Sequence, residues 1–183
     1  REVTHNDVTA WDYPCWPAEW CSAPYLYGKV IVRHFRDMRG VLAGSFLCGG
    51  ELQRHALSCY LLGKARWNPD IDPGAVYDAF ARGLFGRAAG PMRKIIAMQE
   101  EGWMRPWEKN EASLKNVYQV SYPRKDVLNM EKLFAEAEKK AAGDEETLKR
   151  IDWYKAGFET FWRDSRETAE GSSFAPLLIR KAA

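Results

Sequence analysis

The residues best suited to chemistry gather in one short stretch, Trp11-Asp12-Tyr13-Pro14-Cys15-Trp16-Pro17. The flat rings of Trp11, Tyr13 and Trp16 suit sugar rings, because axial C–H bonds make one face of a sugar apolar. Asp12 and Tyr13 add groups that hydrogen-bond sugar hydroxyls, and the two prolines would hold the rings in place. We therefore take Trp11, Asp12, Tyr13 and Trp16 as candidate substrate-binding residues. The alternative is that these aromatic side chains only plug the end of a barrel.

Hydrolysis of a glycosidic bond requires two carboxyl groups, one as acid and one as base or nucleophile. The acids near the aromatic stretch are Asp7, Asp12, Glu19 and Glu51, and no two of them form a pair by spacing. The later acids lie beside lysines at helical spacing, which is typical of a solvated face. No catalytic residue is therefore assigned.

The remaining reactive side chains give no motif. The chain has no nucleotide-binding loop, zinc-ligand run or Gly-x-Ser-x-Gly elbow, so no metal or cofactor is expected. His34 and His55 fall within predicted helices and are interpreted as packed or surface histidines. Of the four cysteines, Cys15 and Cys21 can form a disulfide in an oxidising compartment, and free thiols fit the spacing equally well.

A strand–helix–strand unit must position the aromatic stretch. Residues 8–13 predict a short strand, Pro24 is expected to open a helix that reaches residue 38, and the apolar run 41–47 predicts a second strand. Such apolar runs are typical of parallel strands that are buried on both faces. The two strands are therefore expected to be parallel neighbours, with the helix crossing between them.

Helical spacing continues from residue 51 to about residue 168. The helix 51–67 is expected to bury one face and to hold Trp67 inside, and Asp72 is expected to cap the next helix, with Pro73 in its first turn. Residues 88–102 predict a third helix, and 103–125 are expected to be irregular. The predicted buried faces comprise Leu52, Ala56, Cys59, Tyr60 and Gly63 in the first helix, Val76, Phe80 and Leu84 in the second, and Met92, Ile95 and Ile96 in the third.

A helical hairpin closes the pattern. Asp126 is expected to cap its first helix, Gly143 to end it, and Asp144 to begin the second. The two helices are predicted to pack antiparallel, so that residues 51–168 hold about five helices in one cluster. The apolar positions at coiled-coil-like spacing are Val127, Met130, Phe134, Ala137 and Ala141, followed by Leu148, Ile151, Phe158 and Trp162.

Two segments resemble a known family. They are Tyr60-Leu61-Leu62-Gly63-Lys64-Ala65-Arg66-Trp67-Asn68-Pro69-Asp70-Ile71-Asp72 and Ala79-Phe80-Ala81-Arg82-Gly83-Leu84-Phe85-Gly86-Arg87-Ala88-Ala89-Gly90-Pro91-Met92. Together they resemble the C-terminal region of a bacterial glycoside-hydrolase-like family of unknown function that includes endo-β-N-acetylglucosaminidases. The architecture is also similar to that of α-glucuronidases. Members of that family often have an acidic residue in the last strand, where this chain has Gly44-Ser45-Phe46. The resemblance therefore does not extend to an acidic substrate-binding residue at these positions.

The resemblance implies a fold that is mainly α with a small α/β part: the last strand–helix–strand units of a (β/α)8 barrel, followed by an antiparallel helical cluster. Residues 1–50 would be the barrel end, 51–170 the helical domain and 171–183 a tail. The family's catalytic acid lies on an earlier barrel strand. The resemblance therefore implies a partner, the missing N-terminal part of the same protein, a secreted or periplasmic location, and no hydrolysis by this chain alone.

Composition limits the function classes. The chain has 183 residues, and a complete barrel enzyme needs roughly 250. A net charge of +2 does not indicate nucleic acid as a partner, and no apolar run is long enough for a membrane span. Two functions remain: part of a glycoside hydrolase acting on glycans or polysaccharides, or a non-catalytic carbohydrate-binding or scaffold protein with a partner-binding helical hairpin.

Overall fold

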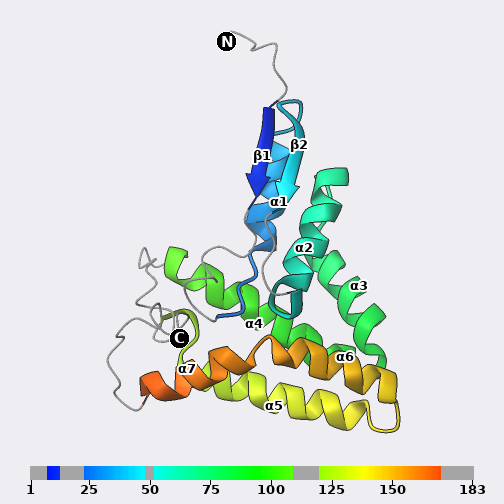
Figure 1. The fold of residues 1–183 in the computed structure, drawn as a ribbon, viewed down its shortest axis with the longest axis vertical. Helices are drawn as coiled ribbons and strands as arrows, with labels where there is room; N and C mark the ends of the chain where they lie inside the picture. Colours follow the sequence, from blue (N-terminus) through cyan, green and yellow to red (C-terminus); the bar gives the residue numbers. More distant parts are fainter. Residues whose placement is uncertain (1–7, 13–22, 48–51, 109–119, 170–183) are drawn as a thin grey trace, which may run out of the picture.

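The computed structural model describes residues 8–12, 23–47, 52–108 and 120–169. The fold is mainly helical, with one small parallel sheet of two strands among these residues (Figure 1). In chain order the elements are β1 (Val8–Asp12), α1 (Gly28–Asp37), β2 (Leu42–Leu47), α2 (Leu52–Trp67), α3 (Pro73–Phe85), a 3-10 turn η1 (Gly86–Ala88), α4 (Ala89–Glu108), α5 (Arg124–Lys140), α6 (Glu145–Ala156) and α7 (Glu159–Ala169).

The strand–helix–strand prediction is confirmed. Strands β1 and β2 are parallel neighbours, and α1 connects them. The predicted start of the helix is wrong, because α1 begins at Gly28 rather than at Pro24. Residues 23–26 instead form a buried non-helical segment, and the Gln99 side-chain amide holds it by donating to the carbonyl of Pro24 at 3.2 Å.

Helix α2 has the predicted extent, but its predicted buried face is wrong. Tyr60 and Leu52 are exposed, and Trp67 is 93% exposed rather than inside. The helix is apolar on both sides, so apolar spacing alone does not decide which side faces the core. The side chains that α2 does bury are those of His55, Leu57, Ser58, Leu61, Leu62 and Ala65.

Helix α3 begins as the sequence predicts. The Asp72 carboxylate accepts hydrogen bonds from the amides of Gly74 and Ala75, and Pro73 occupies the first turn. The helix ends at Gly86, whose φ of +45° favours glycine. The buried stripe is rotated from the predicted one: Tyr77, Ala81 and Phe85 are buried, whereas Val76, Phe80 and Leu84 pack at its border and are only partly buried.

Helix α4 buries Met92, Ile95 and Ile96, as predicted, but it continues to Glu108. Six of the residues expected to be irregular therefore belong to this helix. The helical cluster is also larger than expected: beyond residue 51, the described segments hold six α-helices and the η1 turn, because the last predicted helix is two helices, α6 and α7.

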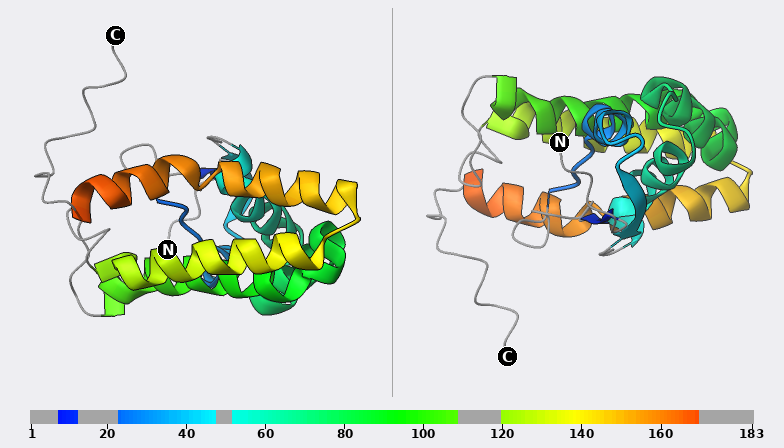
Figure 2. Two further views of the ribbon diagram at one scale, coloured as in Figure 1. Left: turned by 90° about the horizontal axis from the view of Figure 1, so that it is seen from below. Right: turned by 90° about the horizontal axis from the view of Figure 1, so that it is seen from above.

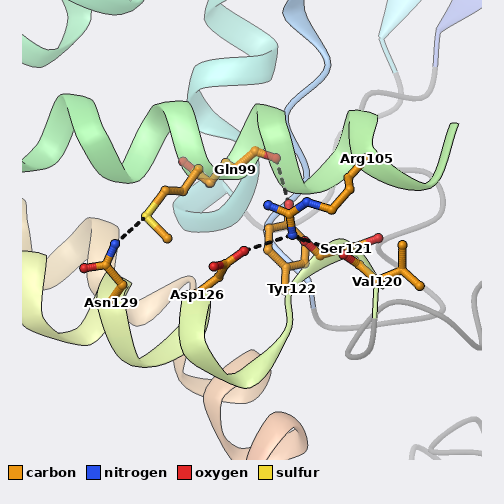
Figure 3. A network of polar contacts seen from close by, with 8 residues as sticks. Gln99, Arg105, Val120, Ser121, Tyr122, Asp126 and Asn129 are labelled. Carbon is orange, nitrogen blue, oxygen red and sulfur yellow. Dashed lines mark hydrogen bonds and ion pairs between the residues drawn. The ribbon is translucent and has the colours of Figure 1, made fainter. Parts of the chain in front are cut away.

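Asp126 does not cap α5. The helix begins at Arg124 after Pro123, and Asp126 lies in its first turn, where it forms an ion pair with Arg105 of α4 at 2.9 Å. Arg105 also donates to the carbonyls of Val120 and Ser121 (Figure 3). The predicted capping group therefore joins α5 to α4 instead.

The helical hairpin is confirmed. Gly143 turns the chain with a φ of +83°, the Asp144 carboxylate accepts from the amide of Thr147, and α6 and α7 return along α5 (Figures 1 and 2). The predicted hairpin positions are buried, with Leu148 only partly so. The break between α6 and α7 lies at Gly157, where a Cβ would come within 2.7 Å of the Gln53 carbonyl oxygen. Glycine therefore allows α2 to approach closely.

One hydrophobic core includes both the α1 segment and the helices that follow. Glu100, which is nearly buried on α4, joins them: its carboxylate accepts from the Lys29 amide at 3.0 Å and from the Tyr77 hydroxyl at 3.1 Å. The positive end of the α1 dipole also stabilises this carboxylate, because it lies beside the first amides of the helix. Gly28 makes this arrangement possible, because a Cβ there would collide with the Tyr77 ring and hydroxyl.

Candidate functional site

The candidate site lies where the two parallel strands end. β1 ends at Asp12 and β2 at Leu47, and these two residues are partners in the sheet. Carboxyl ends of parallel strands share one edge, which is where α/β folds place their binding groups. Helix α1 covers one face of this small sheet, and no helix or strand of the described segments covers the other face, which we call the open face (Figure 1).

An aromatic pair occupies the open face. Trp11 and Phe46 are cross-strand partners, and their ring centroids lie 5.5 Å apart at an interplanar angle of 87°. Trp11 is 64% exposed and Phe46 is 59% exposed. The pair therefore presents an apolar platform to solvent, beside the strand ends.

Asp12 faces the other way. Successive side chains of a strand point to opposite faces, and the Asp12 Oδ1 atom lies 3.7 Å from Nε2 of His34 on α1. The second oxygen of Asp12, Oδ2, is buried and has no hydrogen-bond partner, and the same holds for the Ser45 hydroxyl. A buried polar atom without a partner costs about 1–3 kcal/mol. Asp12 and Ser45 thus both carry a buried acceptor that a donor group would stabilise.

The structure places two of the four predicted site residues. Trp11 and Asp12 lie at the end of β1, as expected, but they face opposite sides of the sheet. One sugar ring stacked flat on Trp11 would therefore not reach Asp12. A ligand that touches both must extend around the end of the strand. Tyr13 and Trp16 lie outside the described residues, as do Cys15 and Cys21 with their suggested disulfide.

Sequence reasoning missed Phe46 and His34. Phe46 was taken as one residue of a strand buried on both faces, and its exposure follows from the open face opposite α1. His34 was interpreted as a packed or surface residue, although its spacing on α1 directs it toward the sheet. A strand–helix–strand model in register would have paired Phe46 with Trp11.

The described strands hold one carboxylate, that of Asp12. Within the described part of the chain, no group of three His, Cys, Asp or Glu side chains is arranged to hold a metal ion. The other buried acid near α1, Glu100, anchors that helix through Lys29 and Tyr77. The site as described therefore offers stacking and hydrogen bonding rather than a pair of reacting carboxyl groups.

The comparisons with known proteins add no relative. No protein-family model matches the chain, and neither a curated protein nor a solved structure matches it. In the described segments, no helix combines the length and apolar character needed to cross a membrane.

Proposed function

We propose that this chain is the C-terminal portion of a barrel-type glycoside hydrolase, in which β1 and β2 are the last two strands of the barrel. The observation that carries the proposal is the exposed Trp11–Phe46 ring pair at the carboxyl edge of two parallel strands. Active sites of barrel enzymes are built at that edge. The resemblance to glycoside-hydrolase-like proteins supports the same assignment.

The chain supplies sugar contacts, and the reacting carboxyl groups come from upstream. The apolar face of a sugar ring stacks on Trp11 beside Phe46, and a hydroxyl of a neighbouring sugar donates to the part of the Asp12 carboxylate that stays exposed (15% of the side chain) on the other side of the strand. The opposite orientation of Trp11 and Asp12 favours an oligosaccharide over a single sugar. Binding by this chain alone should be weak, in the millimolar range (~4 kcal/mol), because few ligand atoms are enclosed.

The proposal is tested by measuring release of reducing sugar from N-glycan and glucuronoxylan substrates. The isolated chain should release none, whereas the longer natural protein should release sugar. Turnover by the isolated chain that Asp12→Asn abolishes would overturn this division and make Asp12 catalytic. Inactivity of both proteins would favour the non-catalytic alternative.

Binding is tested separately with oligosaccharides and the isolated chain, by NMR titration. Trp11→Ala should remove the chemical-shift changes. Trp153→Ala is a matched control, because Trp153 is also exposed (40%) and lies on α6, away from the strands. Equal loss in both variants would show that sugar does not bind at the strand ends.

A non-catalytic carbohydrate-binding or scaffold protein is the second candidate. It is favoured by the single carboxylate of the described strands, since a binding protein needs no acid–base pair. The two candidates share the aromatic platform and differ in the activity of the longer protein.

A further inference from the structure

Helix α2 has a second apolar face that the described fold leaves uncovered. Its inner side packs among α1, α3 and α6. Its outer side carries Leu52, Ala56, Cys59, Tyr60, Gly63 and Trp67 along the whole helix. Ala56 and Cys59 are partly buried, and the Tyr60 ring lies 5.9 Å from that of Phe80 on α3, so the two ends of the stripe are its most open parts. Leu52 is 61% exposed and Trp67 is 93% exposed, so neither end of this stripe contributes to the core. A helix that is apolar on both sides is typical of one that is packed on both sides.

The sheet beside α2 is open as well. Within the described residues, β2 pairs with β1 alone, and so one edge of each strand has no partner. Sheets made only of parallel strands are almost always covered on both faces. Here Trp11 and Phe46, 64% and 59% exposed, lie on the face opposite α1, which no described helix or strand covers.

The order of elements relates these two open surfaces. The connection from β2 to α2 is four residues long, and α2 runs antiparallel to the strands, side by side with α1 (Figure 1). In strand–helix–strand units the connection is right-handed, so the helix that follows a strand lies over the position of the next parallel strand. The position next to β2 on the α2 side is therefore the place for another strand.

We propose that the outer face of α2 and the free edge of β2 together bind a parallel strand and its helix from the part of the same polypeptide that lies upstream. This inference rests on the proposed function. The strand would pair with β2, and its helix would pack along the α2 stripe. Ala56 and Gly63 let a neighbouring backbone approach closely between the large side chains of Leu52, Tyr60 and Trp67. A separate helical partner would cover the stripe and leave the strand edge open, whereas a strand–helix unit covers both.

Hydroxyl-radical footprinting of the longer natural protein and of this chain tests the surface directly. Oxidation of Trp67 should fall at least several-fold in the longer protein, and oxidation of Trp153 on α6 should stay the same. Equal oxidation of Trp67 in both proteins would overturn the inference. So would a natural gene product that has no further strands before residue 1.

Thermal unfolding of variants gives a second reading. Trp67→Ala should leave the Tm of this chain unchanged and should lower the Tm of the longer protein by about 5 °C or more, as expected for a large buried side chain. Trp153→Ala should be neutral in both. If this chain is instead a dimer in sedimentation experiments and Trp67→Ala makes it a monomer, a second copy covers the stripe and the inference is wrong.

The sugar assay separates this inference from the proposed function. If the longer protein protects Trp67 but neither binds nor cleaves glycans, the proposed binding surface is supported and the proposed function is wrong. If the longer protein cleaves glycans while Trp67 stays exposed, the proposed function is supported and the proposed binding surface is wrong.

Discussion

The hairpin of α5, α6 and α7 differs from the β1–α1–β2–α2 region in where its apolar side chains point. In the hairpin, Phe134 contacts Phe158 and Trp162 at centroid distances of 5.2 and 5.5 Å, and all three are buried. In the other region, Trp11, Phe46 and Trp67 face solvent. The apolar side chains of the hairpin are thus buried within the described fold, whereas the strand region has large apolar side chains that no described neighbour buries.

The largest effect should come from the hairpin core. Phe134→Ala should lower the free energy of unfolding by about 3–5 kcal/mol, because it empties a fully buried site. Leu128→Ala on the exposed side of α5 is the control and should cost less than about 1 kcal/mol. Urea unfolding followed by circular dichroism measures both. A small loss for Phe134→Ala would remove the contrast between the two regions.

The next effect depends on pH and on His55, at the buried side of α2. Burial, and secondarily the charge of Arg54, lowers the pKa of His55 to about 4. The unfolded chain takes up this proton near pH 6.5, whereas the folded chain takes it up only near pH 4. Protonation therefore favours the unfolded chain, and the free energy of unfolding is unaffected by His55 above pH 6.5 and decreases as the pH falls toward 4. Between pH 7 and pH 4.5 the loss should be about 2–3 kcal/mol, from 1.36 kcal/mol per pKa unit.

Denaturant unfolding at these two pH values checks this contribution. His55→Leu should reduce the difference between them by about that amount. The same pH difference in His55→Leu and in the unsubstituted chain would show that His55 titrates normally.

Gly28 tests how firmly the strand region is joined to the helices. Gly28→Ala should cost about 1–3 kcal/mol, because its methyl group collides with Tyr77, which donates to Glu100. Gly83→Ala is the matched control: nothing lies near its Cβ position in α3, so it should be neutral or stabilise by up to about 1 kcal/mol. Thermal unfolding compares the two variants. Equal midpoints would mean that Tyr77 can move aside.

The smallest effect concerns a helix cap. Asp72→Ala removes two hydrogen bonds to the first turn of α3 and should cost about 1 kcal/mol. Asp72→Asn, which keeps one side-chain acceptor, should retain most of the stability. Amide exchange in residues 74–77 should accelerate in the alanine variant and much less in the asparagine variant.

Local rules predicted the helix ends well. The Asp72 and Asp144 carboxylates accept from nearby amides at the start of α3 and α6, and Gly86 and Gly143 adopt positive φ where α3 ends and where the chain turns after α5. A short segment of sequence is enough to reveal such local features. Asp126 failed the same rule because its partner, Arg105, comes from another helix. Capping patterns do not contain that tertiary contact.

Periodicity predicted the hairpin and failed on α2 for a related reason. The hairpin helices are apolar on one side, so the stripe from Val127 to Ala141 defines the core face. On α2 both sides are apolar, and Trp67 was assigned to the wrong one. At the candidate site, the sequence correctly put Trp11 and Asp12 at a strand end. It gave neither the register that pairs Trp11 with Phe46 nor the approach of His34 to Asp12.

The buried segment that precedes α1 also bears on how the chain folds. The carbonyl of Pro24 accepts from Gln99, 75 residues away, and Lys29 donates to Glu100, 71 residues away. To form contacts across such separations the chain must first close a long loop, which costs conformational entropy. Contacts of this kind therefore lower the folding rate. Helices α5 and α6 are close in sequence and should therefore associate first. The segment around Pro24 should dock late, and in stopped-flow refolding Gln99→Ala should accelerate unfolding more than it slows folding.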